Sequence, residues 1–436
     1  MKNKRIAVVG GGISGIFAAL LYSKKGFKVT LIEKENKLGG LLCSQNLFKE
    51  NLSFDFGTHF LRQTGIKEID EILYDELEVT QFNYIKSGTF YKTLYAKNGF
   101  LSDQKIPQRE EYFKQLVNSN INEEPTNLKE QLVSDFGEGY TKNLITPIIQ
   151  KLFFTLPENL SVNSHALFGL NRICASNIEL TNKLKLLKRY DNVLAYHSFT
   201  EGISSLKNMY PSKGGVGKWI EKLEEKLILS GVNILKGQKI IDIEIKGDKI
   251  LSINTDIERI EIEELAWTIP IFFLLQKLNI RLSSPPPKRL TSYIFHYLID
   301  QNYLSDLFYI QCFDPSLKSF RITLYDNFSK GLPNKKRISV EVLVENDHQD
   351  TMELKSKVFN ELKQMKIIPN DTIVLNSFEN IYSNGFPVLT KDFIQNSRAQ
   401  TDLVLDTLSN LQIFGKANGN SWFMNDILKE VYNSIS

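Results

Sequence analysis

Short apolar runs and amphipathic stretches follow one another near the start of the chain. Residues 5–9 are mostly apolar and predict a buried strand. A run of glycines follows, and the pattern then predicts a helix that continues to about Lys25 and stops at Gly26, a natural residue for the C′ position. Residues 28–34 predict the next strand. The chain therefore begins as a strand, a tight turn, a helix and a second strand.

Further along the chain the pattern changes twice. Charged and apolar residues follow helical spacing through 110–117 and 128–136, so segment 104–190 is predicted to be mainly helical. Polar and apolar residues alternate more in segment 288–345, which predicts antiparallel strands. The proline run at 285–287 is expected to mark a crossing between domains, because prolines donate no backbone N–H and stay extended.

The glycines of the first turn have the spacing of a dinucleotide site. Gly10 permits a tight turn, Gly12 lets the backbone approach a pyrophosphate, and Gly15 lets the helix pack on the strand. Free N–H groups and the helix dipole favour the pyrophosphate at the helix N-terminus. Glu33 lies about 20 residues further on, where a carboxylate accepts both ribose hydroxyls and disfavours a 2′-phosphate. The sequence therefore predicts a Rossmann-type site that disfavours NADP.

A second pair of glycines decides between dinucleotides. Gly39 and Gly40 follow the acid at position 33 closely and let the chain pass under the rest of a long cofactor, a need that FAD has and NAD does not. A second Gly-x-Gly-x-x-Gly motif does not occur in the sequence, so a separate NAD domain is not expected. The run 214–218 superficially resembles a P-loop, but Trp219 stands where that motif needs Ser or Thr.

Composition and charge exclude several other classes. The 436 residues are 42% apolar and 24% charged, which is typical of a globular chain long enough for two or three domains. The net charge of +3 is spread among interspersed acids, so no nucleic-acid partner is expected. Three widely spaced cysteines suggest the reducing cytoplasm, and five histidines without ligand spacing predict no metal site.

Membrane segments are not expected either. The apolar run after Arg5 is broken by glycines and lacks a cleavage site, so it is not interpreted as a signal peptide. Nothing reaches the roughly 18 apolar residues of a membrane-spanning helix. The nearest stretch, 269–275, is expected to be the start of a buried helix. A peripheral membrane contact stays open, because amphipathic surface anchors are hard to detect in a sequence.

Several motifs together resemble one flavoprotein superfamily. The run 39–42, Gly-Gly-Leu-Leu, and the run 54–60, Phe-Asp-Phe-Gly-Thr-His-Phe, are similar to its N-terminal motifs. The run 410–416, followed by Trp422, resembles its closing flavin motif. The chain thus resembles the flavin-dependent superfamily that includes amine oxidases, protoporphyrinogen oxidase, phytoene desaturases and UDP-galactopyranose mutase.

The resemblance implies a fold and a set of cofactor contacts. It implies an α/β, Rossmann-type FAD-binding domain that is discontinuous and consists of residues 1–80, 205–280 and 395–436. A mixed helical and antiparallel-sheet (α+β) substrate domain would consist of residues 81–204 and 281–394. FAD is expected to bind non-covalently. The expected FAD contacts are Gly10, Gly12, Ile13, Ser14, Gly15, Glu33, Lys34, Gly39, Gly40, Leu41, Leu42, Gly57, Thr58, His59, Ile241, Gly415, Asn425 and Asp426.

Two residues are candidates for catalysis. The resembled mutases carry a histidine at the place of His59, on a loop beside the flavin, where an imidazole can exchange a proton near neutral pH. The alternative is a histidine that only orders the loop. The family's match to Arg321 faces the substrate cavity, where a guanidinium suits a carboxylate or diphosphate. The alternative is an arginine that points outward from its strand.

Departures from the family pattern leave the substrate class open. Lys416 stands where the family usually has arginine, and Leu41 stands where many amine oxidases have arginine. The leading function is an FAD-dependent oxidoreductase that oxidises or desaturates a C–N or C–C bond of a small organic molecule. The alternative is a redox-neutral enzyme of the UDP-galactopyranose mutase kind, acting on a nucleotide sugar. A non-catalytic binding module is disfavoured by the intact phosphate turn and Glu33.

Overall fold

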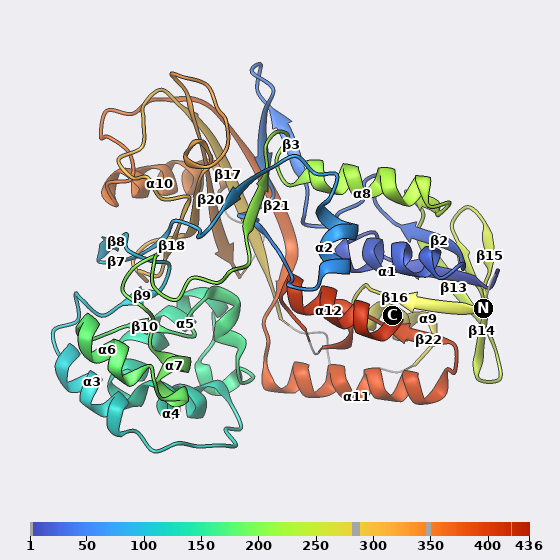
Figure 1. Ribbon diagram of the computed structural model, residues 1–436, viewed down its shortest axis with the longest axis horizontal. Helices are drawn as coiled ribbons and strands as arrows, with labels where there is room; N and C mark the ends of the chain where they lie inside the picture. Colours follow the sequence, from blue (N-terminus) through green and yellow to red (C-terminus); the bar gives the residue numbers. More distant parts are fainter. Residues whose placement is uncertain (1–2, 281–287, 346–349, 420) are drawn as a thin grey trace.

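Three groups of elements make up the structure, a computed structural model that describes residues 3–280, 288–345, 350–419 and 421–436. In Figure 1 a five-stranded sheet and its covering helices lie on the right, a seven-stranded sheet lies left of the centre, and a group of helices lies below that sheet. The proline run at 285–287, expected to mark a domain crossing, lies outside the described residues.

Five parallel strands form the sheet that carries the glycine turn. Their order is β12-β2-β1-β16-β22, and every neighbouring pair is parallel. Ile6 and Val8 pack against one face of the sheet. Ala7 and Val9 pack against the other, so after Arg5 the first strand is apolar on both faces. The strands are β1 Arg5–Val9, β2 Lys28–Glu33, β12 Asn233–Lys236, β16 Glu264–Trp267 and β22 Leu411–Ile413.

Helices cover one face of this sheet, and a small antiparallel sheet with two helices covers the other. The first helix ends as predicted, with Lys25 as its C-cap and Gly26 at a φ of 85°. Ile271, Leu274 and Leu275 are buried, so the run at 269–275 begins a buried helix, as predicted. The first face carries α1 Ile13–Lys24, α2 Lys67–Tyr74, α8 Gly217–Leu229 and α12 Met424–Ile435. The second carries β13 Ile240–Lys246, β14 Lys249–Thr255, β15 Arg259–Glu261, α9 Ile271–Lys277 and α11 Lys391–Thr407.

The seven-stranded sheet contains the strands predicted in segment 288–345. Its order is β21-β17-β20-β19-β18-β7-β8, and its pairs are antiparallel except for β18 with β7. The helix α10 Thr351–Gln364 packs on one face. The strands are β7 Ser87–Tyr91, β8 Thr93–Tyr95, β17 Arg289–Ile299, β18 Tyr309–Cys312, β19 Ser319–Leu324, β20 Lys336–Val344 and β21 Val374–Pro387.

The helical group occupies most of segment 104–190, as predicted. A buried amine ties it to the seven-stranded sheet: Lys151 Nζ donates to the carbonyl oxygens of Cys312 at 2.7 Å, Asp314 at 2.8 Å and Ser319 at 2.8 Å. The elements are α3 Arg109–Asn118, α4 Leu128–Tyr140, a π-helical turn Thr141–Ile145, α5 Thr146–Phe153, α6 Ile178–Leu184 and α7 Lys188–Val193.

A buried carboxylate at the end of a short hairpin links the hairpin to β11, to the start of α8 and to the turn that follows β19. Asp55 accepts from Ser44 Oγ at 2.5 Å, Tyr210 Oη at 2.6 Å and the Val216 N–H at 3.0 Å. Its own N–H donates to Tyr325 Oη at 3.0 Å. Burial raises the pKa of Asp55 to about 6, against the opposing effect of these donors. The remaining short strands are β3 Ser44–Leu47, β4 Leu52–Asp55, β5 Leu61–Arg62, β6 Val79–Phe82, β9 Leu101–Ser102, β10 Ile173–Cys174 and β11 Asn208–Pro211.

Removing this carboxylate should destabilise the fold strongly. Asp55→Ala leaves two buried hydroxyls and a buried amide without their acceptor, so we expect a loss of about 2–5 kcal/mol in the free energy of unfolding, measured in urea. The control Tyr210→Phe removes a single donor and should cost about 1–2 kcal/mol. Equal losses for the two variants would contradict the central role of the carboxylate.

Candidate functional site

The glycine turn between β1 and α1 leaves open space in front of the helix. Gly10 has a φ of 106°, and a Cβ on Gly15 would lie 1.8 Å from the Gly10 carbonyl oxygen, so both positions need glycine. Gly12 differs, because a Cβ there would meet no atom of the described chain within 4 Å. The backbone at Gly12 therefore faces space that a ligand can use.

Glu33 and Gly39 border this space. Glu33 Oε2 accepts from the Gly11 N–H at 2.6 Å, and its Oε1 accepts from the Glu35 N–H at 2.9 Å. The Gly39 N–H donates to the Gly11 carbonyl at 2.7 Å. A Cβ on Gly40 would meet only the Cα of Gly12, at 3.8 Å. The second glycine pair thus lies directly across from the turn, and together they form a narrow backbone cradle.

The cradle fits the pyrophosphate of a dinucleotide. Gly12 is the N-cap of α1, and within the described chain no side chain caps this helix and no acid lies in its first turn. The amides at the start of the helix, including those of Ile13 and Ser14, therefore keep their donors for an anion. Ser14 is half-buried, and Ile13 packs against the core below.

The loop between β4 and β5 meets a carboxylate from the seven-stranded sheet. Glu341 on β20 accepts from the Thr58 N–H at 3.1 Å and pairs with Arg321 on β19, with Nε to Oε1 at 2.6 Å and Nη2 to Oε2 at 2.7 Å. Gly57 has a φ of 106°, and a Cβ there would lie 3.2 Å from Glu341 Oε2. Although burial opposes ionisation, the guanidinium holds the pKa of Glu341 below its ordinary value. Arg321 therefore faces the loop with its charge already balanced.

His59 lies on this loop, and its lowered pKa favours the neutral imidazole at physiological pH. Its ring is half-buried, and Nε2 lies 3.1 Å from the Phe56 carbonyl oxygen. Because a carbonyl can only accept, Nε2 carries the proton and Nδ1 keeps its lone pair. Burial, followed by the positive charge of Arg321, lowers the pKa of His59 to about 4. The imidazole can thus accept a hydrogen bond or a proton at Nδ1.

The turn between β22 and α12 closes the site from the C-terminal side. Gly415 has a φ of 69°, and a Cβ there would lie 2.6 Å from Ser14 Oγ. Lys416 is exposed to solvent, yet surrounding protein lowers the pKa of its amine through desolvation. Asn425 Nδ2 donates to the Gln63 carbonyl at 3.2 Å, and its buried Oδ1 lacks a hydrogen-bond partner among the described residues. The start of α12 therefore meets the segment that follows His59.

Other predicted contacts lie further from the cradle. Lys34 is exposed and lies 3.5 Å from a Glu35 carboxylate oxygen. Ile241 is 55% exposed on β13, and its carbonyl accepts from Lys277 Nζ at 3.0 Å. Leu41 is 50% exposed, Leu42 packs against the core, Trp422 is half-buried, and Asp426 is exposed in the first turn of α12. Contacts thus connect the first glycines with Glu33, Gly39 and Gly415 as one group, and the 57–59 loop with Arg321 and Glu341 as a second group. The exposed side chains of Lys34 and Ile241 belong to neither group.

Sequence reasoning missed Glu341 and Thr268. Glu341 lies 20 residues beyond Arg321 and is its cross-strand neighbour, a relation that exists only once the strands have paired. Thr268 Oγ1 donates to the Val9 carbonyl at 2.8 Å and lies 2.5 Å from the position of a Cβ on Gly10. Thr268 directly follows β16, a second strand of the parallel sheet, and this position was the signal that could have identified it.

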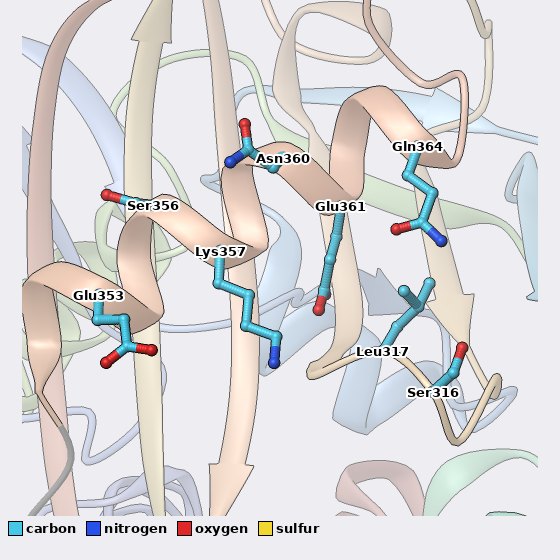
Figure 2. A pocket seen from close by; sticks show the side chains of 8 residues that line it. All are labelled: Ser316, Leu317, Glu353, Ser356, Lys357, Asn360, Glu361 and Gln364. Carbon is cyan, nitrogen blue, oxygen red and sulfur yellow. The ribbon is translucent and has the colours of Figure 1, made fainter.

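A separate groove runs along α10. Figure 2 shows Lys357 and Gln364 of α10 on one side of it and Leu317 on the other. Glu361 also lines it, but this carboxylate accepts from the N–H groups of Lys318 at 2.8 Å and Ser319 at 2.9 Å. Glu361 thus anchors the turn before β19, and the groove has no part in the site described above.

Comparisons with known proteins agree with this architecture. The family described as "NAD(P)-binding Rossmann-like domain" matches residues 8–77. The chain is 25% identical over 282 residues to 4,4'-diapolycopen-4-al dehydrogenase of Metabacillus indicus. This alignment covers 59% of this chain and 54% of that protein. The chain therefore spans about half the length of that curated relative.

Solved structures match over the whole chain. A crystal structure of reduced UDP-galactopyranose mutase superimposes with a TM-score of 0.77 at 15% identity, covering 100% of this chain and 95% of that one. A putative protoporphyrinogen oxidase from Exiguobacterium sp. 255-15 gives 0.71 at 16% identity, covering 100% and 98%. These are fold-level likenesses.

Fold and cradle together define a protein with a Rossmann-type dinucleotide site. Residues 8–77 match the Rossmann-like family, and the fold over the whole chain is the one shared by the mutase and the putative oxidase, as the motifs predict. Across the described residues, none of the helices combines the length and apolarity that crossing a bilayer requires.

Gly12→Ala should separate cofactor binding from folding. A Cβ at this position meets nothing in the described chain, and the φ of −73° suits alanine, so unfolding in urea should change by less than about 1 kcal/mol. The methyl group fills the cradle, and FAD affinity measured by titration of apoprotein should fall by about tenfold or more, as charge-assisted hydrogen bonds are lost.

Gly15→Ala is the matched variant. Its Cβ collides with the Gly10 carbonyl oxygen, so it should destabilise the fold by more than about 3 kcal/mol. Unchanged FAD affinity in Gly12→Ala would place the pyrophosphate elsewhere.

Proposed function

We propose that this protein holds FAD non-covalently and catalyses the two-electron oxidation or desaturation of an organic substrate. The observation that carries the proposal is the cradle between Gly12 and Gly40, with Glu33 at its border. Bound FAD would supply the acceptance of a hydride or of single electrons. The cradle would hold the pyrophosphate, Glu33 the ribose, and the start of α12 the pyrimidine edge.

The protein's own residues would position the substrate and manage protons. His59, neutral and with a lone pair at Nδ1, can accept a proton released from the substrate. Glu341 accepts from the Thr58 N–H and thereby fixes the position of the loop that carries the imidazole. The paired Arg321 offers hydrogen-bond donors without a net charge, which suits a polar neutral group better than a free anion.

The relatives narrow the reaction class. The Metabacillus indicus protein is named as a dehydrogenase of a polyene aldehyde, which supports dehydrogenation or desaturation over plain amine oxidation. Fold likeness to the mutase keeps the second candidate. The polar surroundings of His59, with Arg321, Glu341 and Lys416, favour a polar substrate such as a nucleotide sugar.

Two further assignments belong to this proposal. The division into a cofactor domain of residues 1–80, 205–280 and 395–436 and a substrate domain of 81–204 and 281–394 stays a prediction. Three strands of the five-stranded sheet that lie far apart in sequence, β1, β16 and β22, support it. The three cysteines are free thiols, which supports a cytoplasmic location.

Stoichiometry distinguishes the two enzyme classes. The purified, FAD-loaded protein is given polyene aldehydes, polyenes, amines and UDP-galactopyranose in turn, with a dye as electron acceptor. An oxidoreductase should consume one acceptor for each product formed. A mutase should turn over many times after a single reduction with dithionite and leave the acceptor untouched. A protein that stays colourless when FAD is added would refute both.

His59→Ala tests the role of the imidazole. The variant should keep FAD but shift its visible spectrum or reduction potential, and turnover should fall by roughly 10²-fold if the residue transfers a proton. Because the pKa of His59 lies near 4, the wild-type profile should show no inflection from this residue near pH 6.5. The control is His197→Ala in the helical group. A lower melting temperature with unchanged spectrum and potential would make His59 a loop-ordering residue.

A further inference from the structure

Large aliphatic side chains gather on α6 and on the turn that leads to α7. Ile178 is 51% exposed and Leu180 is 39% exposed. The consecutive Leu186 and Leu187, which lie in the turn, are 85% and 58% exposed. We call these four side chains the α6–α7 patch. In Figure 1 it belongs to the helical group, at the opposite end of the molecule from α1 and the cradle.

The backbone beneath the patch is held firmly. Asn177 caps α6 by accepting from the Leu180 N–H at 2.9 Å. The buried Lys185 Nζ donates to the Leu194 carbonyl at 2.8 Å and pairs with Asp191 at 2.6 Å. Arg189 Nη2 donates to Ser119 Oγ at 2.7 Å. The two leucines therefore project from a structured turn.

Basic residues outnumber acidic ones in the segment that carries the patch. Segment 171–191 holds five basic and two acidic side chains, whereas the whole chain holds 53 basic and 50 acidic ones. The local excess equals the net charge of the entire protein. Lys183 and Lys188 are exposed, but Lys183 pairs with Glu179 at 2.7 Å and the buried Lys185 pairs with Asp191 at 2.6 Å. The local excess of positive charge is therefore carried by the exposed Lys188 and the half-buried Arg172 and Arg189. The basic side chains are Arg172, Lys183, Lys185, Lys188 and Arg189.

Another exposed aliphatic pair lacks this charge. Ile228 and Leu229 at the end of α8 are 61% and 83% exposed. Segment 217–229, which carries them, holds three basic and three acidic side chains. Exposed leucines alone therefore do not distinguish the α6–α7 patch. Its combination of protruding aliphatic groups with a cationic border does.

We propose that the α6–α7 patch docks the protein on an anionic lipid surface. Leucines on a protruding turn can enter the acyl boundary, while flanking lysines contact the phosphate groups of the headgroups. A protein partner fits less well, because the patch has no aromatic anchor and leucine is rare among interface residues that dominate binding. The contact is peripheral and does not depend on the proposed reaction.

Vesicle flotation tests the docking with the FAD-loaded protein. The wild type should float with vesicles of seven parts phosphatidylcholine to three parts phosphatidylserine, and should bind pure phosphatidylcholine about tenfold or more weakly. Salt at about 1 M, where the screening length is about 3 Å, should release it. Leu186→Ser with Leu187→Ser should weaken binding by about tenfold or more, because the two exposed leucines can no longer bury apolar surface in the membrane. Lys183→Gln with Lys188→Gln should weaken it and flatten the salt dependence.

Ile228→Ser with Leu229→Ser is the matched control and should bind as the wild type does. Wild-type protein that binds neither kind of vesicle overturns the proposal. Equal vesicle binding by the Leu186→Ser, Leu187→Ser variant and the Ile228→Ser, Leu229→Ser control also overturns it. A lower molecular mass in solution for Leu186→Ser with Leu187→Ser, without any vesicle binding by the wild type, would overturn it in favour of an interface between two copies of this chain. FAD content should be unchanged in all variants, because the patch lies far from the cradle.

Discussion

A single buried carboxylate holds together four segments that lie between the two large sheets. Asp55 receives donors from the hairpin that carries it, from β11 and from the start of α8, while its own N–H reaches Tyr325 beside the seven-stranded sheet. A buried charge is costly unless it is fully hydrogen-bonded, so these segments cannot move apart independently. The raised pKa of Asp55 records the remaining cost of its burial.

The loop that carries His59 begins right after this carboxylate. Asp55 fixes one end of the loop, and Glu341 fixes Thr58 from the opposite sheet. The imidazole is therefore positioned by both halves of the molecule. The same arrangement sets its charge state, because burial and the nearby guanidinium hold the ring neutral, while Glu341 partly offsets that guanidinium. The residues that position His59 thus also help to set its protonation state.

Local features of the fold could be predicted from sequence, but long-range ones could not. The turn at Gly10 and Gly15 and the helix end at Gly26 follow from steric rules that act within a few residues. The pairing of Arg321 with Glu341 depends on the register between β19 and β20, which no local pattern encodes. Sequence reasoning could therefore name Arg321 but not the carboxylate that balances its charge. The long edge strand β21 was missed because its alternation is interrupted by polar residues.

The α6–α7 patch is a surface that the net charge and the hydropathy of the whole chain do not reveal. A net charge of +3 excludes a basic stripe along the chain, yet a local excess of the same size remains possible in one short segment. Hydropathy searches detect long apolar runs, whereas this surface comes from a three-residue turn between short helices. Thr181 and Lys185 between the exposed residues are buried, so neither periodicity nor composition reveals which side faces outward. Only the packing of the helical group determines that Leu186 and Leu187 are exposed together with Lys183 and Lys188.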